Sequence, residues 1–249
     1  MPERELNPDG VYPKPSNQLA DFKVGVDNVI FSVDIDQKRL LILLILRQES
    51  PFAAQWSLPG TLVRQGESLE DAAYRTLAEK VQVQNLYLEQ LYSFGGPGRD
   101  PREAPDSFGD RYLSVSYFAL VPYGEAKLIA EGAKNIAWHE VTQLPNLAFD
   151  HRDIIDYGCR RLKNKLEYSP IAFEVLPQHF TLNDLYQFYE TVLGQHFSDY
   201  SNFRTRLLKL GFLADTGHKL SRGAGRPASL YKFDAIAFEP LKNKPLVFV

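Results

Sequence analysis

Residues 56–83, WSLPGTLVRQGESLEDAAYRTLAEKVQV, decide the fold of the first half of this chain. Pro59-Gly60 interrupts the backbone, and Ser68 then opens a helix that we expect to reach Lys80. The Ser68 hydroxyl can cap this helix, since Asp71 stands three residues later and the first turn is acidic. Apolar residues recur every four positions, so one face of the helix should pack against a core. These positions are Leu69, Ala73 and Leu77.

Strand patterns surround this helix. Residues 24–34 and 40–46 are apolar runs joined by the polar turn Asp36-Gln37-Lys38, which predicts a buried hairpin. Residues 95–111 are too rich in Gly, Pro and charge for regular structure, and a loop of this length is usually functional. Further strands are expected at residues 86–94, 112–121 and 136–138, and a closing helix at residues 150–166.

The charge distribution divides the chain in two. Residues 1–157 contain 15 Lys and Arg against 23 Asp and Glu, a net charge of −8, whereas residues 158–249 contain 13 against 8, a net of +5. We therefore expect a polar tail at residues 1–20, an acidic domain at residues 21–157 and a basic domain at residues 158–249. The basic domain favours a polyanionic partner, and chance segregation of charge is the alternative.

Composition excludes several classes of protein. Apolar residues make up 44% of the 249, enough to bury real cores, and no apolar run approaches the roughly 20 residues that span a bilayer. We therefore expect no membrane contact. The single cysteine, Cys159, excludes an internal disulfide framework and suits the reducing cytoplasm. It has no catalytic partner in the sequence, and the five histidines show no metal-ligand spacing.

The first stretch resembles the Nudix hydrolase box, G-x5-E-x7-R-E-U-x-E-E-x-G-U, in which U is apolar. Aligned on Glu67 and Arg75, the match also keeps Glu79 and the preceding Leu58-Pro59-Gly60. Four positions depart from the pattern. Thr61 and Gln82 replace glycines, and Thr76 and Lys80 replace glutamates.

These departures bear on metal chemistry. In the Nudix family, carboxylates at positions 76, 79 and 80 share one helix face and hold divalent cations that clamp a pyrophosphate. Only Glu79 remains of that trio, and the Lys80 ammonium would repel a cation, so the resemblance implies no catalytic residue, no required cofactor and doubtful Mg²⁺ binding. Our hypothesis is that Lys80 supplies part of the missing metal charge, so that a diphosphate binds uncleaved. The alternative is a scaffold helix with Lys80 on its surface.

An arginine-bearing loop follows. Arg99-Asp100-Pro101-Arg102, with Arg111 shortly after, resembles a loop near the ligand pocket of the Nudix-related transcriptional regulators. Guanidinium groups suit phosphate because they donate paired hydrogen bonds, although surface arginines of a mobile loop are the alternative. Residues 103–110 make this loop longer than the family's short form. The predicted effector-binding residues are Arg47, Arg64, Glu67, Glu79, Lys80, Arg99, Arg102 and Arg111.

The basic half changes to short helices. Thr181 caps one predicted helix, and residues 201–210 form a second, which Gly211 ends. Strand-like residues 212–216 and 229–233 flank a basic, Gly-rich connection. This part resembles the winged helix of the same regulators, and the resemblance covers most of the chain. The matching segments are residues 147–151, 168–173, 180–182, 202–204 and 225–231.

Residues 201–210 are the expected DNA-reading helix. Phe203, Leu207 and Leu210 should face the core, which leaves a polar and basic stripe suited to the major groove. The wing would follow the DNA backbone or enter the minor groove. A solvated helix and an ordinary hairpin are the alternative. The predicted DNA-binding residues are Asn202, Arg204, Arg206, Lys209, Arg222 and Arg226.

The resemblance implies an α/β (α+β) chain, with a Nudix α/β/α sandwich of mixed sheet followed by a winged helix. It implies a transcriptional regulator, most simply a repressor, that binds a palindromic operator as a homodimer. It also implies an effector related to ADP-ribose or NAD, and a pentose stays open as another effector. An active Nudix hydrolase of ADP-ribose and a pure protein-interaction module are the rival interpretations.

Overall fold

The apolar hairpin predicted near the start of the chain forms the centre of a seven-stranded sheet. Strand β1 (Phe22–Asp34) pairs antiparallel with β2 (Arg39–Leu46), and the register brings Asp34 opposite Arg39 across the turn. The other side of β1 pairs in parallel with β6 (Arg111–Val121). The structure is a computed structural model that describes residues 19–81, 86, 88–103, 111–131, 133–194, 197, 199–222, 226–242 and 244.

Shorter strands complete this sheet. The main path runs β3-β2-β1-β6-β5, with β4 also paired to β1 and β7 to β2. The pairing of β1 with β6 is parallel and the others are antiparallel, so the sheet is mixed as predicted. The added strands are β3 (Trp56–Ser57), β4 (Gly60–Leu62), β5 (Glu89–Phe94) and β7 (Ile136–Glu140).

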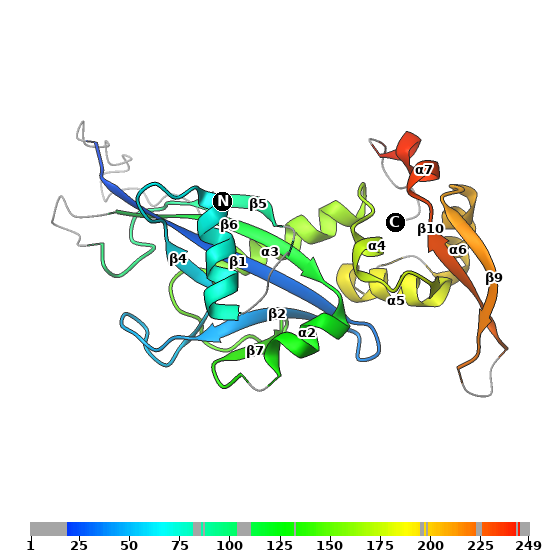
Figure 1. Ribbon diagram of the computed structural model, residues 1–249, viewed down its shortest axis with the longest axis horizontal. Helices are drawn as coiled ribbons and strands as arrows, with labels where there is room; N and C mark the ends of the chain where they lie inside the picture. The colour runs from blue at the N-terminus through cyan, green and yellow to red at the C-terminus, as the bar shows by residue number, and fades with distance from the viewer. Residues whose placement is uncertain are drawn as a thin grey trace, which may run out of the picture.

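Helices cover both faces of the sheet (Figure 1). Helix α1 (Leu69–Thr76) and the π-helical turn η1 (Leu77–Val81) pack on one face, together with α2 (Tyr123–Ala130), which the sequence did not predict. Helix α3 (His151–Leu166) packs on the other face. Ser68 caps α1 by accepting a hydrogen bond from the Asp71 N–H, as its spacing predicted. The α/β/α sandwich is confirmed.

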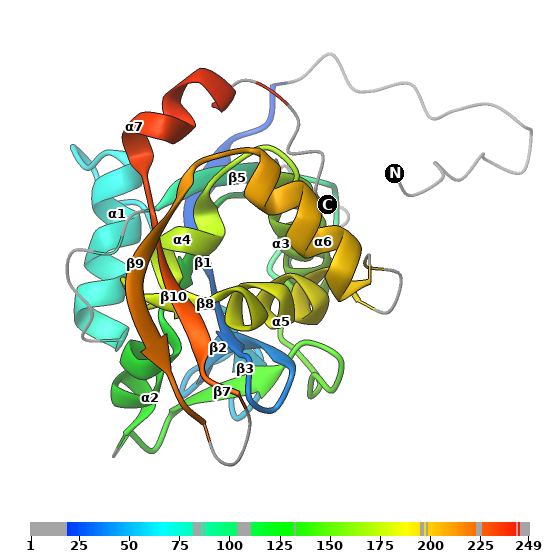
Figure 2. The same cartoon turned by 90° about the vertical axis from the view of Figure 1, so that its right-hand side faces the viewer.

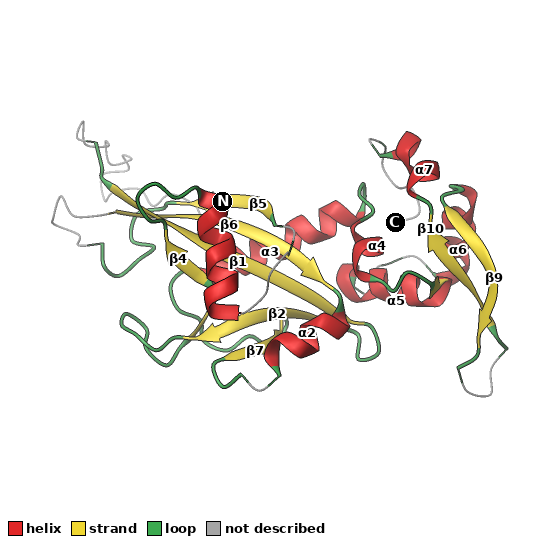
Figure 3. Cartoon of the chain, viewed as in Figure 1, coloured by secondary structure: helices red, strands yellow, loops and turns green. Residues whose placement is uncertain are grey.

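The second half of the chain is a winged helix (Figure 3). Thr181 and Asp184 form a reciprocal capping box at the start of α5, and Gly211 has a φ of 76° just after α6, where a left-handed residue ends the helix. A three-stranded sheet of order β8-β10-β9 carries the wing. The elements are α4 (Ile171–Val175), β8 (Phe180–Thr181), α5 (Leu182–Leu193), α6 (Tyr200–Lys209), β9 (Leu213–Leu220), β10 (Ala228–Phe233), α7 (Ala235–Phe238) and η2 (Glu239–Leu241).

Helix α3 joins the two halves. It begins under the large sheet and ends against α4 and α5, so the expected boundary between residues 157 and 158 falls inside one continuous helix (Figures 1 and 2). One apolar core includes Phe31 of the large sheet, Leu162 of α3 and Phe188 of α5. An ion pair of 2.8 Å between Lys38 and Glu190 adds a polar contact between the halves. No helix in the described part of the chain is long and apolar enough to cross a membrane.

Candidate functional site

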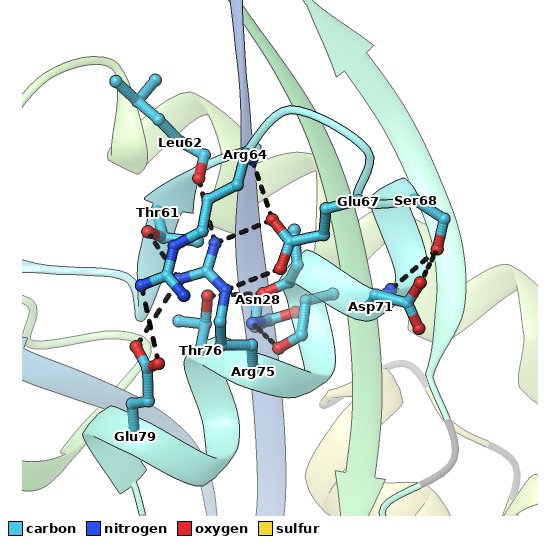
Figure 4. Close-up of polar contacts among 12 residues, drawn as sticks. Asn28, Thr61, Leu62, Arg64, Glu67, Ser68, Asp71, Arg75, Thr76 and Glu79 are labelled. Carbon is cyan, nitrogen blue, oxygen red and sulfur yellow. Dashed lines mark hydrogen bonds and ion pairs between the residues drawn. The ribbon is translucent and has the colours of Figure 1, made fainter.

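Glu67 and Arg75, which this chain keeps from the Nudix box, form an ion pair with each other. Arg75 donates from Nε to Glu67 Oε1 at 2.6 Å and from Nη2 to Oε2 at 2.9 Å, and the Arg64 N–H also donates to Glu67 (Figure 4). Hydrogen bonds from Arg75 and from the Arg64 backbone lower the pKa of Glu67 to about 2. Glu67 therefore fixes the loop before α1 to the helix, and both its oxygens are engaged.

Positions 76 and 79 of this chain do not share an exposed helix face, unlike the carboxylates of the Nudix family. Thr76 is fully buried and its hydroxyl donates to the Ala72 carbonyl at 2.8 Å, whereas Glu79 is exposed and lies near Arg64 and Arg75 (Figure 4). The cause is the π-helical turn η1, which takes an extra residue per turn and so rotates the residues that follow Thr76. Three metal-binding side chains at positions 76, 79 and 80 would require residue 76 to face away from the core.

Lys80 extends toward the loop that precedes β4. Its Nζ donates to the Gly60 carbonyl at 2.5 Å, and the side chain lines two adjoining cavities. Burial lowers the pKa of Lys80, and the positive charge of Arg47 lowers it further. The residue is exposed, and its side chain lies at a cavity wall.

The two cavities lie side by side at one edge of the sheet. One is about 330 Å³ and the other about 820 Å³, and they share Ile45, Arg47, Glu49 and Lys80 as walls. Each cavity lies within the range of about 300–1,000 Å³ that is common for small-molecule pockets. Among the predicted effector residues, the smaller cavity is lined by Arg47, Lys80, Arg99 and Arg102, and the larger by Arg47, Glu79 and Lys80.

Two loop arginines of the smaller cavity already have carboxylate partners. Arg99 forms a two-pronged ion pair with Asp150, with a shortest contact of 2.6 Å, and only 9% of its side chain is exposed. Arg102 forms a similar pair with Asp100 and lies 4.1 Å from the Tyr112 ring centroid. These contacts hold the guanidinium groups in place, which a binding site requires.

Arg47 is held differently. Its Nε donates to the Pro51 carbonyl at 2.9 Å, and its guanidinium lies 4.8 Å from the centroid of the Phe149 ring. Within the described part of the chain, neither Arg47 nor Lys80 forms an ion pair with a carboxylate. Burial lowers the pKa of Arg47, and the charge of Arg102 lowers it further. Two cations without carboxylate partners therefore meet at the shared wall of the cavities.

Three predicted effector residues lie outside the cavity walls. Arg64 is exposed near Glu79, and Glu67 is bound to Arg75. Arg111 donates to the Gly95 carbonyl at 2.8 Å and lies over the Phe22 ring. Residues 104–110, most of the longer stretch in the arginine loop, lie outside the described residues.

The sequence analysis missed a polar group at the cavity floor. His151 is buried, and its Nδ1 accepts a hydrogen bond from the Leu58 N–H at 2.9 Å. Its Nε2 lies 3.5 Å from Asp27 Oδ1, and the Ser114 hydroxyl donates to Asp27 Oδ2 at 2.6 Å. These residues come from β1, β6 and the start of α3, so no local spacing could reveal them. The matching segment at residues 147–151 was the only sequence sign of His151.

Other candidate groups have ordinary roles. Burial raises the pKa of the Cys159 thiol to about 11, which keeps it protonated and unreactive. Trp138 donates to the Ala126 carbonyl, and His139 packs edge-on against Trp56, so both serve strand packing. Among the described residues, no group of three or more His, Cys, Asp or Glu side chains is placed to hold a metal ion.

The winged helix presents the expected basic stripe. Phe203 and Leu207 are buried and Leu210 is half-buried, while the polar positions of α6 are all exposed. Asp199 caps α6 and also accepts from the Asn202 side chain. The exposed positions are Asn202, Arg204, Arg206 and Lys209.

The two wing arginines differ. Arg222 pairs with Asp184 at 2.6 Å, so the wing is tied to the start of α5, although 61% of the Arg222 side chain stays exposed. Arg226 is exposed on the other side of the wing tip, and residues 223–225 lie outside the described residues. Both guanidinium groups are accessible on the same hairpin as β9 and β10.

The chain matches known families in both halves. Residues 22–157 match the NUDIX domain, and residues 168–249 match the AraR C-terminal winged HTH domain. The chain is 36% identical over 212 residues to the ADPR responsive transcriptional repressor NtrR of Acinetobacter baylyi, which covers 84% of this chain and 80% of that protein. It is 34% identical over 135 residues to the ADP-ribose pyrophosphatase of Methanocaldococcus jannaschii, which covers 54% of this chain and 72% of that protein.

A solved structure extends the likeness to both halves. Shewanella oneidensis NrtR, crystallised with a 27mer DNA, superposes with a TM-score of 0.71 at 34% identity, covering 86% of this chain and 94% of that chain. A Nudix sandwich followed by a winged helix defines the class of protein as a transcriptional regulator with a ligand-sensing domain. Within that class, the chain belongs to the Nudix-related transcriptional regulators, as its sequence predicted.

Proposed function

We propose that this protein is a repressor that binds operator DNA through α6 and the wing, and that releases it when ADP-ribose occupies the Nudix pocket. The support for the ligand class is the pair of cations at the shared cavity wall. Burial and the Arg47 charge lower the pKa of Lys80, and neither group forms an ion pair with a carboxylate among the described residues, although the charges of Asp27 and Glu49 act on both. A diphosphate placed between Arg47 and Lys80 would neutralise both. The relatives named for a response to ADP-ribose favour that diphosphate.

We also propose that the bound ligand stays intact. Thr76 is buried at the position where the family has a metal ligand, and the Lys80 ammonium donates a hydrogen bond to the Gly60 carbonyl oxygen. The pocket residues thus supply positive charge directly, and this favours binding that needs no divalent cation. Isothermal titration of ADP-ribose in EDTA tests the proposal, and a strict requirement for Mg²⁺ would contradict it.

The rival function is hydrolysis, because the archaeal relative is named as a pyrophosphatase. Release of AMP from ADP-ribose with Mg²⁺ or Mn²⁺ separates the two functions. We expect no turnover above the uncatalysed reaction, and turnover at about 1 s⁻¹ or faster would make the chain an enzyme.

The DNA partner follows from the exposed stripe of α6. Arg and Asn side chains on such a helix read guanine and adenine, and Lys binds phosphate. We propose a homodimer in the cytoplasm, since two recognition helices related by two-fold symmetry match a palindromic operator. Sedimentation of the full chain tests the dimer.

The decisive experiment is a gel shift on the DNA upstream of the gene, with ADP-ribose, NAD and pentoses titrated separately. We expect a salt-dependent protein–DNA complex that dissociates when ADP-ribose is added. A pure protein-interaction module would give no salt-dependent DNA complex. Release by a pentose but not by ADP-ribose would show that the effector is a pentose.

A further inference from the structure

The floor of the smaller cavity holds one carboxylate in a fixed orientation. Asp27 lies in the middle of β1, its side chain is 13% exposed, and it lines the cavity together with Ser114 and His151. The Ser114 hydroxyl donates to Oδ2, and His151 Nε2 faces Oδ1. Gly60 stands directly opposite Asp27 in the β1–β4 pairing, where it leaves room for the carboxylate.

His151 faces this carboxylate with a neutral ring. Its Nδ1 accepts the Leu58 N–H and therefore carries no proton, which places the ring proton on Nε2, the atom nearest Asp27. Burial lowers the pKa of His151, which also favours the neutral ring. The Ser114 hydroxyl and the His151 ring thus fix the orientation of the Asp27 carboxylate, which keeps lone pairs that a ligand can reach from the cavity.

The charges around the cavity restrict what Asp27 can bind. Arg47 and Lys80 line this cavity without an ion pair to a carboxylate and would repel a cationic donor, whereas Arg99 and Arg102 are already paired with Asp150 and Asp100. A neutral donor carried by an anionic molecule fits both requirements. Hydroxyl groups of a phosphorylated sugar have this chemistry, because the phosphate can reach the cations while the hydroxyls reach the carboxylate.

We propose that Asp27 accepts hydrogen bonds from the sugar hydroxyls of the effector and is the residue that selects a phosphorylated sugar over a simple phosphate anion. This inference rests on the proposed function, because it assigns a second subsite in the same pocket. Ser114 and His151 are positioning residues that orient the carboxylate.

The test compares three probes on the full chain: ADP-ribose, ribose 5-phosphate and inorganic pyrophosphate, each by isothermal titration in EDTA. Asp27→Asn keeps the size of the side chain but removes its charge. It should weaken binding of ADP-ribose and of ribose 5-phosphate about 10- to 100-fold, as expected for a lost hydrogen bond to a charged group. Pyrophosphate carries no sugar hydroxyl and is more highly charged, so its affinity should be unchanged or higher once a repelling carboxylate is gone.

The controls separate selection from folding. Asp153→Asn makes the same chemical change on the exposed surface of α3 and should leave all three affinities unchanged. Ser114→Ala should weaken the sugar ligands less than Asp27→Asn, because the carboxylate remains. Equal losses for sugar ligands and pyrophosphate in Asp27→Asn would show a merely structural role and overturn this inference alone. A wild-type protein that binds none of the three probes would overturn the proposed function itself.

Discussion

Replacing Gly60 with alanine should damage the pocket through one added methyl group. A Cβ at this position would lie 2.0 Å from Asp27 Oδ1 and 2.9 Å from the Val26 carbonyl oxygen. Asp27 cannot move aside freely, because Ser114 binds its other oxygen at 2.6 Å, and the Val26 carbonyl belongs to the central strand. Overpacking of this kind costs about 1–3 kcal/mol. For a chain of this size, that corresponds to a fall in Tm of about 2–12 °C.

Thermal unfolding and titration of ADP-ribose would measure both consequences of Gly60→Ala. We expect the lower Tm together with at least a tenfold loss of affinity, because the displaced Asp27 and the carbonyl that holds Lys80 both line the cavity. Gly96→Ala is the matched control, since nothing lies within 4 Å of the added Cβ and its effect should stay within about 0.5 kcal/mol. Wild-type Tm and affinity in Gly60→Ala would refute the assigned geometry.

Three further perturbations test other parts of the molecule. Arg206→Ala should weaken operator binding by about 1–3 kcal/mol and relax base preference, as measured by fluorescence anisotropy. Arg160→Ala, at an exposed position of α3, is the control and should leave operator binding unchanged. Unchanged affinity in Arg206→Ala would show that another surface reads the DNA. Glu67→Gln should remove stabilisation that is present above pH 4.5 and lost as the pH falls toward 2, because the folded pKa is lowered to about 2; equal loss of Tm on acidification in both proteins would contradict this. Thr76→Glu combined with Lys80→Glu should lower the urea midpoint and restore no Mg²⁺-dependent release of AMP, since the first carboxylate would be buried; turnover would show that position 76 can reach a metal.

Local patterns carried most of the fold. The hairpin of β1 and β2 could be predicted because two apolar runs flank one polar turn. The starts of α1 and α5 could be predicted because Ser68 and Thr181 are capping residues that precede helical apolar patterns. Each of these features depends on residues close in sequence. Helix α2 was missed, since its apolar and polar residues are poorly separated and its packing comes from the sheet beneath it.

The pocket was predicted only in part, for two physical reasons. The rule that residues i, i+3 and i+4 share a helix face holds for a regular α-helix. The π-helical turn after Thr76 changes which residues share a face, so the rule fails there. The polar floor joins residues that are far apart in sequence, 87 positions between Asp27 and Ser114 and 93 between Leu58 and His151. Such contacts follow from sheet pairing, which a single sequence does not specify. Arg47 was predicted because it ends the Leu-rich strand, and Lys80 because it replaces a glutamate of the Nudix box.

The segment just before α3 connects the pocket to the DNA-binding half. Phe149 lies under the Arg47 guanidinium, Asp150 holds Arg99, and His151 faces Asp27, so three successive residues each support a different cavity wall. His151 is also the first residue of α3, whose far end packs into the same core as α5. A ligand that draws Arg99 away from Asp150 must break a buried two-pronged ion pair at the start of this helix. Because α3 is continuous and packs against both the large sheet and α5, we expect a shift at its start to reach the contacts of the winged helix (Figure 1).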